Sequence, residues 1–242
     1  MKLSKIDWCD ITWNPVTGCL HNCEYCYARG IAKRFGAHLD TDNLTAVELH
    51  QKGENPYPYD FFPTYHRYRL GDPMQRIDPQ TIFVCSMADL FGEWVPDEWI
   101  REVFNSCIEA RQHKYLFLTK NPARYHDLRK KGILPTADNF WFGFSITKQS
   151  DLHKAWADCA WMDYNTFVSI EPLHGPVDIE IENRIRWVIV GAETGNSKTK
   201  VIPQREWIED IVDSCHDAKV PLFMKRNLTD VWGEPLIQEY PW

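Results

Sequence analysis

The most informative stretch of the sequence is residues 18–27, which read Gly18-Cys19-Leu20-His21-Asn22-Cys23-Glu24-Tyr25-Cys26-Tyr27. The three cysteines have CxxxCxxC spacing, so one tight loop can direct three thiolates inward onto a compact inorganic core. A cubane cluster contains four irons, and three protein thiolates leave its fourth iron with open coordination sites. The spacing therefore predicts a [4Fe-4S] cluster held by Cys19, Cys23 and Cys26, with the open iron available to a substrate or cofactor.

Two alternatives compete with this interpretation. The loop could form a zinc site completed by Cys9 or His21, or its cysteines could pack as small apolar residues. Structural zinc takes four ligands, typically from two CxxC-like pairs, and the sequence has no second pair. The other cysteines are isolated in sequence and are expected to be buried packing residues: Cys85, Cys107, Cys159 and Cys215.

Beyond residue 80 the sequence alternates short apolar, β-branched runs with segments of helical character. The expected helices include 97–112 and 204–218, and each begins next to a proline. The expected strands are 81–85, 115–118, 140–146, 166–170, 187–190 and 221–224. This alternation predicts an α/β fold with about six parallel strands, arranged as an open sheet or as a barrel, and the pattern alone does not choose between them.

The first eighty residues depart from this rhythm. A short strand at 11–13, the cysteine loop and a helix at 27–35 are followed by a long irregular insertion at 36–79 that is rich in proline and aromatic residues. A connection of that length is typical of a lid or binding loop, although a decorated surface loop explains it equally well. We expect a single domain that covers residues 1–242.

Composition limits the classes of protein that fit. The chain has 242 residues, of which 44% are hydrophobic and 25% charged, and no apolar run approaches the ~20 residues of a membrane helix. The N-terminus lacks the apolar core of an export signal, so we expect a soluble, cytoplasmic protein with reduced thiols. A formal net charge of −7 argues against a broad surface that coats nucleic acid, but it leaves room for a local basic groove.

The CxxxCxxC loop, with Tyr25 before the third cysteine and a short strand before the loop, resembles the radical S-adenosylmethionine superfamily. The resemblance implies a partial (β/α) barrel in which the open iron chelates the methionyl group of S-adenosylmethionine. It further implies that an electron from the reduced cluster cleaves this cofactor to a 5'-deoxyadenosyl radical, which abstracts hydrogen from a substrate. An electron donor of the flavodoxin or ferredoxin kind would then be a partner.

A second resemblance covers nearly the whole chain and points to a phage-associated family of unknown function, often encoded beside a three-Cys-motif partner protein. Many relatives have a second glycine where this chain has Ala192, and many space the first two cysteines further apart. The motifs that carry the resemblance are Trp13-Asn14-Pro15-Val16-Thr17-Gly18, Pro63-Thr64-Tyr65-His66, Ser86-Met87-Ala88-Asp89-Leu90-Phe91, Leu118-Thr119-Lys120, Ile170-Glu171-Pro172-Leu173 and Gly191-Ala192-Glu193-Thr194-Gly195.

Polar residues follow several of the expected strands, and in a parallel barrel the C-terminal ends of the strands carry the functional site. The superfamily resemblance implies that Asp89, or the backbone near Ser86, meets the methionyl amino group. Ser145 is the first candidate for the ribose and Glu171 the second. The turn at Gly191 would let the backbone approach the adenine, and Glu193 completes the set of expected cofactor-binding residues.

Charged residues at the strand ends predict a polar ligand. Lys120 and Lys225 would bring two cations to the same cavity as Glu171 and Glu193, an arrangement that is costly unless the charges pair or bind something charged. We assign Lys120, Lys225 and Arg226 to the substrate. A further group could form a basic lip for phosphate or a solvated charge run: Lys198, Lys200 and Arg205.

The sequence thus predicts a radical S-adenosylmethionine enzyme that modifies an unidentified substrate, with a nucleotide or nucleic acid as the first candidate. The alternative is a non-enzymatic iron-sulfur or zinc-binding scaffold or redox sensor in a phage-associated system.

Overall fold

The computed structural model describes residues 2–53, 55–159, 164–179, 184–194 and 200–242. The chain divides into two compact units, Met1–Phe140 and Trp141–Trp242, and each is described by itself. Within the described residues, no helix is long and apolar enough to cross a membrane.

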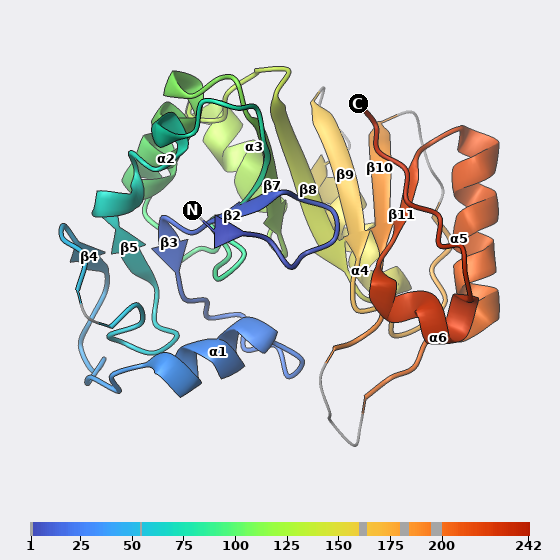
Figure 1. Cartoon of the computed structure of the whole chain (residues 1–242), viewed down its shortest axis with the longest axis horizontal. Coiled ribbons are helices and arrows are strands. Elements are labelled where there is room, and N and C mark those ends of the chain that lie inside the picture. Colours follow the sequence, from blue (N-terminus) through green and yellow to red (C-terminus); the bar gives the residue numbers. More distant parts are fainter. Residues whose placement is uncertain (1, 54, 160–163, 180–183, 195–199) are drawn as a thin grey trace. The chain divides into compact units, whose positions relative to one another are not determined.

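The first unit is built on four strands in the order β1 (Lys2–Leu3), β2 (Ile11–Trp13), β6 (Thr81–Val84) and β7 (Lys114–Thr119). Figure 1 labels β2 and β7. β1 is antiparallel to β2, whereas β2, β6 and β7 are parallel. The parallel strands are almost continuously apolar because both of their faces are buried, as is typical of α/β folds.

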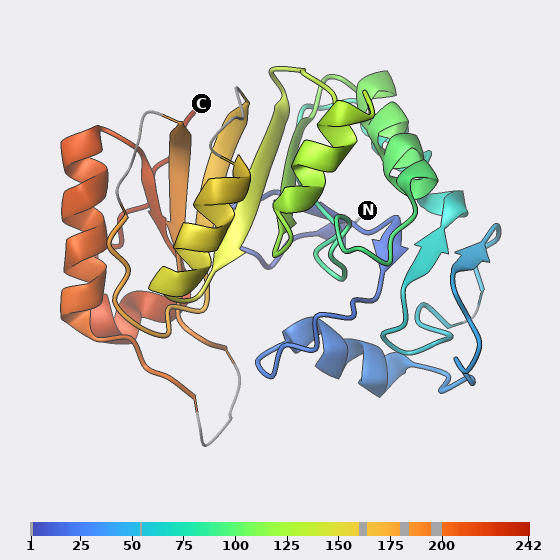
Figure 2. The ribbon, with the colours of Figure 1, turned by 180° about the vertical axis from the view of Figure 1, so that it is seen from behind.

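Two helices complete the core of this unit, α2 (Asp97–Glu109) and α3 (Ala123–Lys130), and Figure 2 shows α3 in front of β7. Phe104 of α2 packs edge-on against Phe117 of β7 with ring centroids 5.2 Å apart. Asp97 accepts hydrogen bonds from Arg124 and Lys131, so the acidic first turn of α2 is tied to α3 and the residue just after it. Aromatic packing therefore holds α2 to the parallel strands, and charge pairing joins α2 to α3.

The insertion is more ordered than the sequence predicts. It contains β4 (Val47–Leu49) and β5 (Thr64–His66), which form a three-stranded sheet with β3 (Val16–Thr17) in the order β3-β5-β4. Two short 3₁₀ turns follow, at Arg67–Arg69 and Pro73–Gln75. Strands of two or three residues are too short to show a period-2 pattern, which explains why the sequence gives no sign of this sheet.

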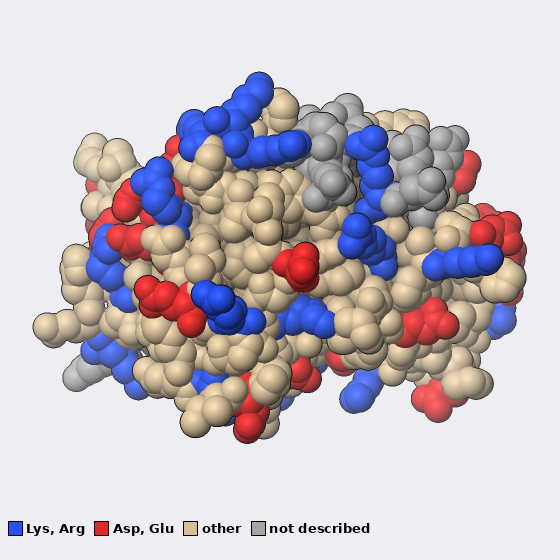
Figure 3. Space-filling view, turned by 90° about the horizontal axis from the view of Figure 1, so that it is seen from above, with Lys and Arg blue, Asp and Glu red and all other residues tan. Residues whose placement is uncertain are grey.

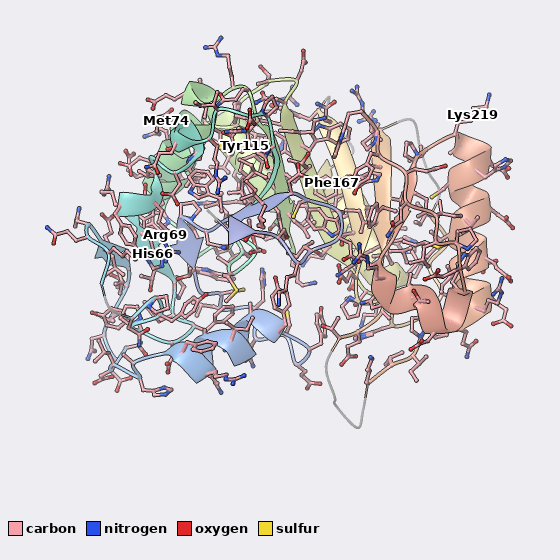
Figure 4. The ribbon with its side chains drawn as sticks, in the orientation of Figure 1. His66, Arg69, Met74, Tyr115, Phe167 and Lys219 are labelled. Atoms are coloured by element: carbon pink, nitrogen blue, oxygen red, sulfur yellow. The ribbon has the colours of Figure 1, made fainter. Side chains whose placement is uncertain are left out.

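His66 fixes the small sheet from within, and Figure 4 labels it beside Arg69. Its side chain is fully buried, with Nε2 2.8 Å from Thr17 Oγ1 and Nδ1 3.3 Å from Tyr68 Oη. Burial lowers the pKa of His66 to about 3, and the charge of Arg69 acts in the same direction. The imidazole is therefore neutral at physiological pH and serves as a hydrogen-bonding strut between β3 and β5.

The second unit carries four parallel strands, β8 (Phe140–Ile146), β9 (Asn165–Ile170), β10 (Ile185–Val190) and β11 (Leu222–Met224). Figure 2 shows α4 (Gln149–Cys159) lying across the face of β9. The unit also contains α5 (Arg205–Ala218), a 3₁₀ turn at Arg226–Leu228 and the short helix α6 (Thr229–Trp232).

The C-terminal tail runs along β11. Met224 N donates to Ile237 O at 2.7 Å, and Glu239 N donates to Leu222 O at 2.9 Å. The indole of Trp187 donates to Glu239 O, and its rings lie 5.2 Å from the ring of Trp242. The tail therefore satisfies backbone groups of an edge strand that would otherwise be open to another chain.

Most expected elements are present, with small differences at their ends. The helix expected at 97–112 ends at Glu109, because Ala110 has φ −110° and ψ 56° and leaves the helical conformation. Three of the four isolated cysteines are buried as predicted, namely Cys85, Cys107 and Cys215, while the side chain of Cys159 lies outside the described residues. The single-domain expectation stays a prediction.

Candidate cluster-binding loop and strand-end residues

The cysteine loop leaves β3 through a glycine that no other residue could replace without rearrangement. Gly18 has φ +89°, and a Cβ at this position would lie 2.2 Å from Phe62 O, which is a backbone atom. Gly18 N donates to Met87 O at 2.9 Å, and Cys19 N donates to Phe61 O at 3.0 Å. The start of the loop is thus fixed against the insertion on one side and the turn after β6 on the other.

The end of the loop is the start of α1 (Tyr27–Phe35). Cys26 is the N-cap residue, and its Sγ accepts a hydrogen bond from Arg29 N at 3.4 Å. Cys19 and Cys26 both pack against one apolar cluster, formed by Ala28, Ala32, Phe61 and Met87. The first and third cysteines are therefore held on a common support.

The thiol of Cys19 is largely buried, and Cys23 and Cys26 lie close enough to act on it. Burial raises the pKa of Cys19 to about 12; a backbone hydrogen bond from His21 opposes the rise, and Asp89, Cys23 and Cys26 add to it. A thiol with so high a pKa stays protonated at neutral pH unless a cation replaces its proton. A positively charged iron core would relieve this cost, so the donor set fits a cluster bound by three cysteines.

The zinc alternative needs ligands beyond the three cysteines of the loop. Across the part of the chain that the structure describes, no three His, Cys, Asp or Glu side chains, those of the loop cysteines included, lie close enough together to enclose one metal ion. A structural zinc ion requires four ligands at about 2.0–2.3 Å. Cys9, one of the two residues expected to complete such a site, instead donates to Ser4 Oγ at 3.2 Å.

Asp89 lies beneath the loop, in the turn after β6. Its side chain is only 7% exposed, and Oδ2 accepts hydrogen bonds from His21 Nε2 at 2.7 Å and from Lys120 N at 2.9 Å. Oδ1 accepts from Phe91 N at 3.0 Å and from Thr119 Oγ1 at 2.7 Å. The structure thus brings Asp89 to the cysteine loop and surrounds it with protein donors, while its expected contact with the methionyl amino group stays a prediction.

Ser86 bonds to residues on both sides of the cysteine loop, Asn14 before it and Tyr27 at its end. Its carbonyl accepts from Tyr27 Oη at 2.7 Å, and its hydroxyl donates to Asn14 Oδ1 at 3.2 Å. Asn14 Oδ1 also accepts from Met87 N at 2.9 Å. No role was predicted for Asn14, although its place directly before Pro15 favours an extended backbone after β2.

Lys120 follows β7 and lies over the ring of Tyr25, with Nζ 5.4 Å from the ring centroid. This cation–π contact joins the residue expected to meet substrate to the loop expected to hold the cluster. Cys19, Cys23, Cys26, Ser86, Asp89 and Lys120 are therefore neighbours within the first unit.

In the second unit, Glu171 and Lys225 form an ion pair between their side chains, which project from the ends of β9 and β11. The pair passes over Gly191, where a Cβ would lie 2.8 Å from Lys225 Cδ and 3.4 Å from Glu171 Cδ. Gly191 thus leaves space for charged side chains above the end of β10. Two of the charged residues that the sequence brings to one cavity do pair with each other.

Glu193 also bonds within the second unit. It is 9% exposed, and its Oε2 lies 3.0 Å from His174 Nε2. Next to it, Asn227 clamps the backbone of Ala192: Ala192 N donates to Oδ1 at 3.1 Å, and Nδ2 donates to Ala192 O at 2.7 Å. The sequence did not predict a role for His174 or Asn227, because the position of a residue after a strand does not reveal which loops lie next to one another in the fold.

The remaining candidates occupy less enclosed positions. Ser145 pairs in register with Ser169 across β8 and β9, and Arg226 is exposed at the first position of a 3₁₀ turn. Arg205 of the expected basic lip bonds to Glu209 and to Trp232 O, so its guanidinium is already engaged. Lys198 lies outside the described residues.

Comparison with solved structures identifies the fold. The chain resembles spore photoproduct lyase in a structure with bound AdoMet and dinucleoside spore photoproduct, at a TM-score of 0.54 and 10% sequence identity, covering 88% of this chain and 75% of the other. Another structure of a spore photoproduct lyase variant gives a TM-score of 0.49 at 10% identity, with 86% and 74% coverage. The likeness at a TM-score of 0.54 shows that this protein has an α/β fold of the partial-barrel type, which confirms the fold expected from sequence.

A family model matches residues 3–236 and is described as a protein of unknown function (DUF5131). Because the match covers nearly all of the chain, the protein belongs to this family. No curated protein matches its sequence.

Proposed function

We propose that this protein is a radical S-adenosylmethionine enzyme whose [4Fe-4S] cluster is held by Cys19, Cys23 and Cys26. The observation that carries the proposal is the set of three thiols on one loop, with Cys19 buried and Cys26 capping α1. The partial-barrel fold supports it, because the spore photoproduct lyase structure of the same fold contains bound AdoMet. When bound, the cluster and S-adenosylmethionine would supply reductive cleavage of the cofactor and hydrogen abstraction from a substrate.

The chain's own residues would bind and orient these groups. The three thiols would release their protons and bind iron as thiolates, and the apolar cluster under Cys19 and Cys26 would keep water from that side of the site. For S-adenosylmethionine we propose the backbone near Ser86 for the methionyl amino group and Ser145 for the ribose. Glu171, Gly191 and Glu193 would take the remainder of the cofactor, with Glu171 released from Lys225 on binding.

For the substrate we propose a nucleotide or nucleic acid, with Lys120, Lys225 and Arg226 as candidate contacts. The support is indirect: the spore photoproduct lyase structure contains a dinucleoside lesion. Figure 3 shows Lys and Arg side chains interspersed with Asp and Glu on the face seen from above. The formal net charge of −7 suits a short or locally bound substrate better than a long duplex, which requires many phosphate contacts.

The proposal is tested by anaerobic purification or reconstitution. We expect brown protein with about four irons per chain that, after chemical reduction, converts S-adenosylmethionine to 5'-deoxyadenosine in the absence of substrate. Colourless protein with one tightly held zinc would overturn the proposal. A four-iron cluster that never cleaves S-adenosylmethionine would contradict the enzymatic part and favour a scaffold or redox sensor. Addition of a reduced flavodoxin then tests the expected electron donor, and co-purification tests the three-Cys-motif partner.

A further inference from the structure

The carboxylate of Asp89 is fully occupied by the protein. A carboxylate offers about four lone-pair positions, and four donors fill them here: two backbone amides, one hydroxyl and one imidazole. These donors come from three segments, namely its own turn, the end of β7 and the cysteine loop. An amino group of a bound molecule could reach Asp89 only if one of these bonds broke, which argues against the direct cofactor contact expected from sequence.

His21 is the donor from the cysteine loop, and it lies between Cys19 and Cys23 in sequence. Besides its 2.7 Å contact with Asp89, its ring stands edge-on to Trp94 with centroids 4.9 Å apart. Gly92 leaves room for this arrangement, because a Cβ there would lie 2.3 Å from the Trp94 ring. The His21 side chain, 23% exposed, is thus held from two directions by residues that follow β6.

We propose that Asp89 is a positioning residue, which fixes the cysteine loop in its cluster-binding conformation through His21. Hydrogen bonds at Gly18 and Cys19 hold the start of the loop, and those at Cys26 and Tyr27 hold its end. Between these ends, Lys120 contacts the ring of Tyr25. The bond from His21 to Asp89 ties the middle of the loop to the end of β7, next to Asn22, which has φ 55°. The role in cluster binding rests on the proposed function, whereas the tie itself does not.

The first test measures the tie in metal-free protein by hydrogen–deuterium exchange of peptides that cover residues 18–27. His21→Ala removes the donor, so we expect loop amides to exchange about ten- to hundredfold faster, as expected for loss of one hydrogen bond to a charged group. His21→Gln restores an N–H donor at similar reach and should return exchange to within about threefold of wild type. Leu20→Ala, an exposed neighbour, is the matched control and should leave exchange unchanged.

The second test measures iron release from reconstituted protein under a chelator. His21→Ala and Asp89→Asn should both lose iron about tenfold faster than wild type, with His21→Gln intermediate. If Asp89→Asn also raises exchange in β7, the substitution has disturbed the core, and the His21→Ala variant alone then tests the proposal.

Three outcomes would contradict parts of the proposal. An exchange rate in His21→Ala equal to that of wild type, or failure of His21→Gln to restore the wild-type rate, would overturn the tie. A loosened loop in His21→Ala that keeps its iron as firmly as wild type would overturn the role in cluster binding. If wild-type protein binds no iron, the proposed function fails while the exchange result still tests the tie.

Discussion

The strand ends of the two units hold their carboxylates in different ways. In the first unit, Asp89 accepts from two backbone amides as well as from the Thr119 hydroxyl and the His21 imidazole, and the backbone amides stay in place when side chains move. In the second unit, Glu171 pairs with the ammonium group of Lys225, and Glu193 bonds to the imidazole of His174. A backbone-bonded carboxylate is suited to fix a loop, whereas side-chain partners can rotate away and be replaced by a charged ligand. The comparison indicates a rigid site in the first unit and an adaptable one in the second.

The largest expected effect tests the thiols of the rigid region. Cys23→Ala should reduce iron from about four per chain to a small fraction, because a cubane with two protein thiolates is poorly held. Cys9→Ala, a half-buried thiol outside the loop, is the control and should retain full iron. Both are measured by iron analysis after anaerobic reconstitution. Equal iron loss in the two variants would contradict the choice of ligands.

The second effect tests the rigidity of the loop entrance. Gly18→Ala forces a Cβ onto a backbone carbonyl and places alanine in a positive-φ conformation that it tolerates poorly. We therefore expect a loss of about 3 kcal/mol or more in the free energy of unfolding. Gly132→Ala has a similar φ of +66° but open space around its Cβ, and should cost only about 1 kcal/mol. Urea unfolding of both variants separates the clash from the backbone strain. Equal losses would show that the entrance can relax.

A third effect, of about 2 kcal/mol, concerns the pH dependence of the small sheet. His66 has a folded-state pKa of about 3, below its ordinary value of 6.5, so the unfolded state binds the proton more readily between these values. Stability should therefore fall as pH decreases from 7 to 5, by about 2 kcal/mol from this group. Urea unfolding at both pH values checks this, and His66→Gln should show a smaller loss over the same interval. An unchanged pH dependence in His66→Gln would assign the loss to other groups.

The smallest effect tests the adaptable region. Gly191→Ala would place a Cβ against Lys225 Cδ, but Gly191 has no positive φ and the lysine chain can move aside. We expect a loss of at most about 1 kcal/mol in the free energy of unfolding. Gly175→Ala, with nothing near its Cβ, is the control. A loss as large as that of Gly18→Ala would abolish the contrast between the two regions.

Much of the fold could be predicted because its parallel strands are apolar on both faces. β8 occupies the residues expected for it, since all but one of its seven residues are buried and the run is unmistakable. The sheet of β3, β5 and β4 could not be predicted, because its strands are two or three residues long and its stability comes from buried contacts such as that of His66 with Thr17.

The candidate site was predictable to a different degree in each region. Strand-end position was enough to single out Asp89 and Glu171, but not to say what each would bond to. The partners of Asp89 come from residues 21, 91, 119 and 120, and their convergence depends on loop paths that no sequence period encodes. The pairing of Lys225 with Glu171 was easier to expect, because opposite charges brought to one place must be compensated.

The tail that runs along β11 has a practical consequence for anyone who shortens or extends this chain. A deletion that begins at Ile237 would leave Met224 N and other groups of β11 without their partners and would uncover the aromatic rings around Trp187. Such a protein would present an unpaired edge strand beside exposed aromatic side chains, and we expect it to self-associate. A lower yield of soluble protein after these last residues are removed would then reflect aggregation, and it would carry no information about the chemistry of the cysteine loop.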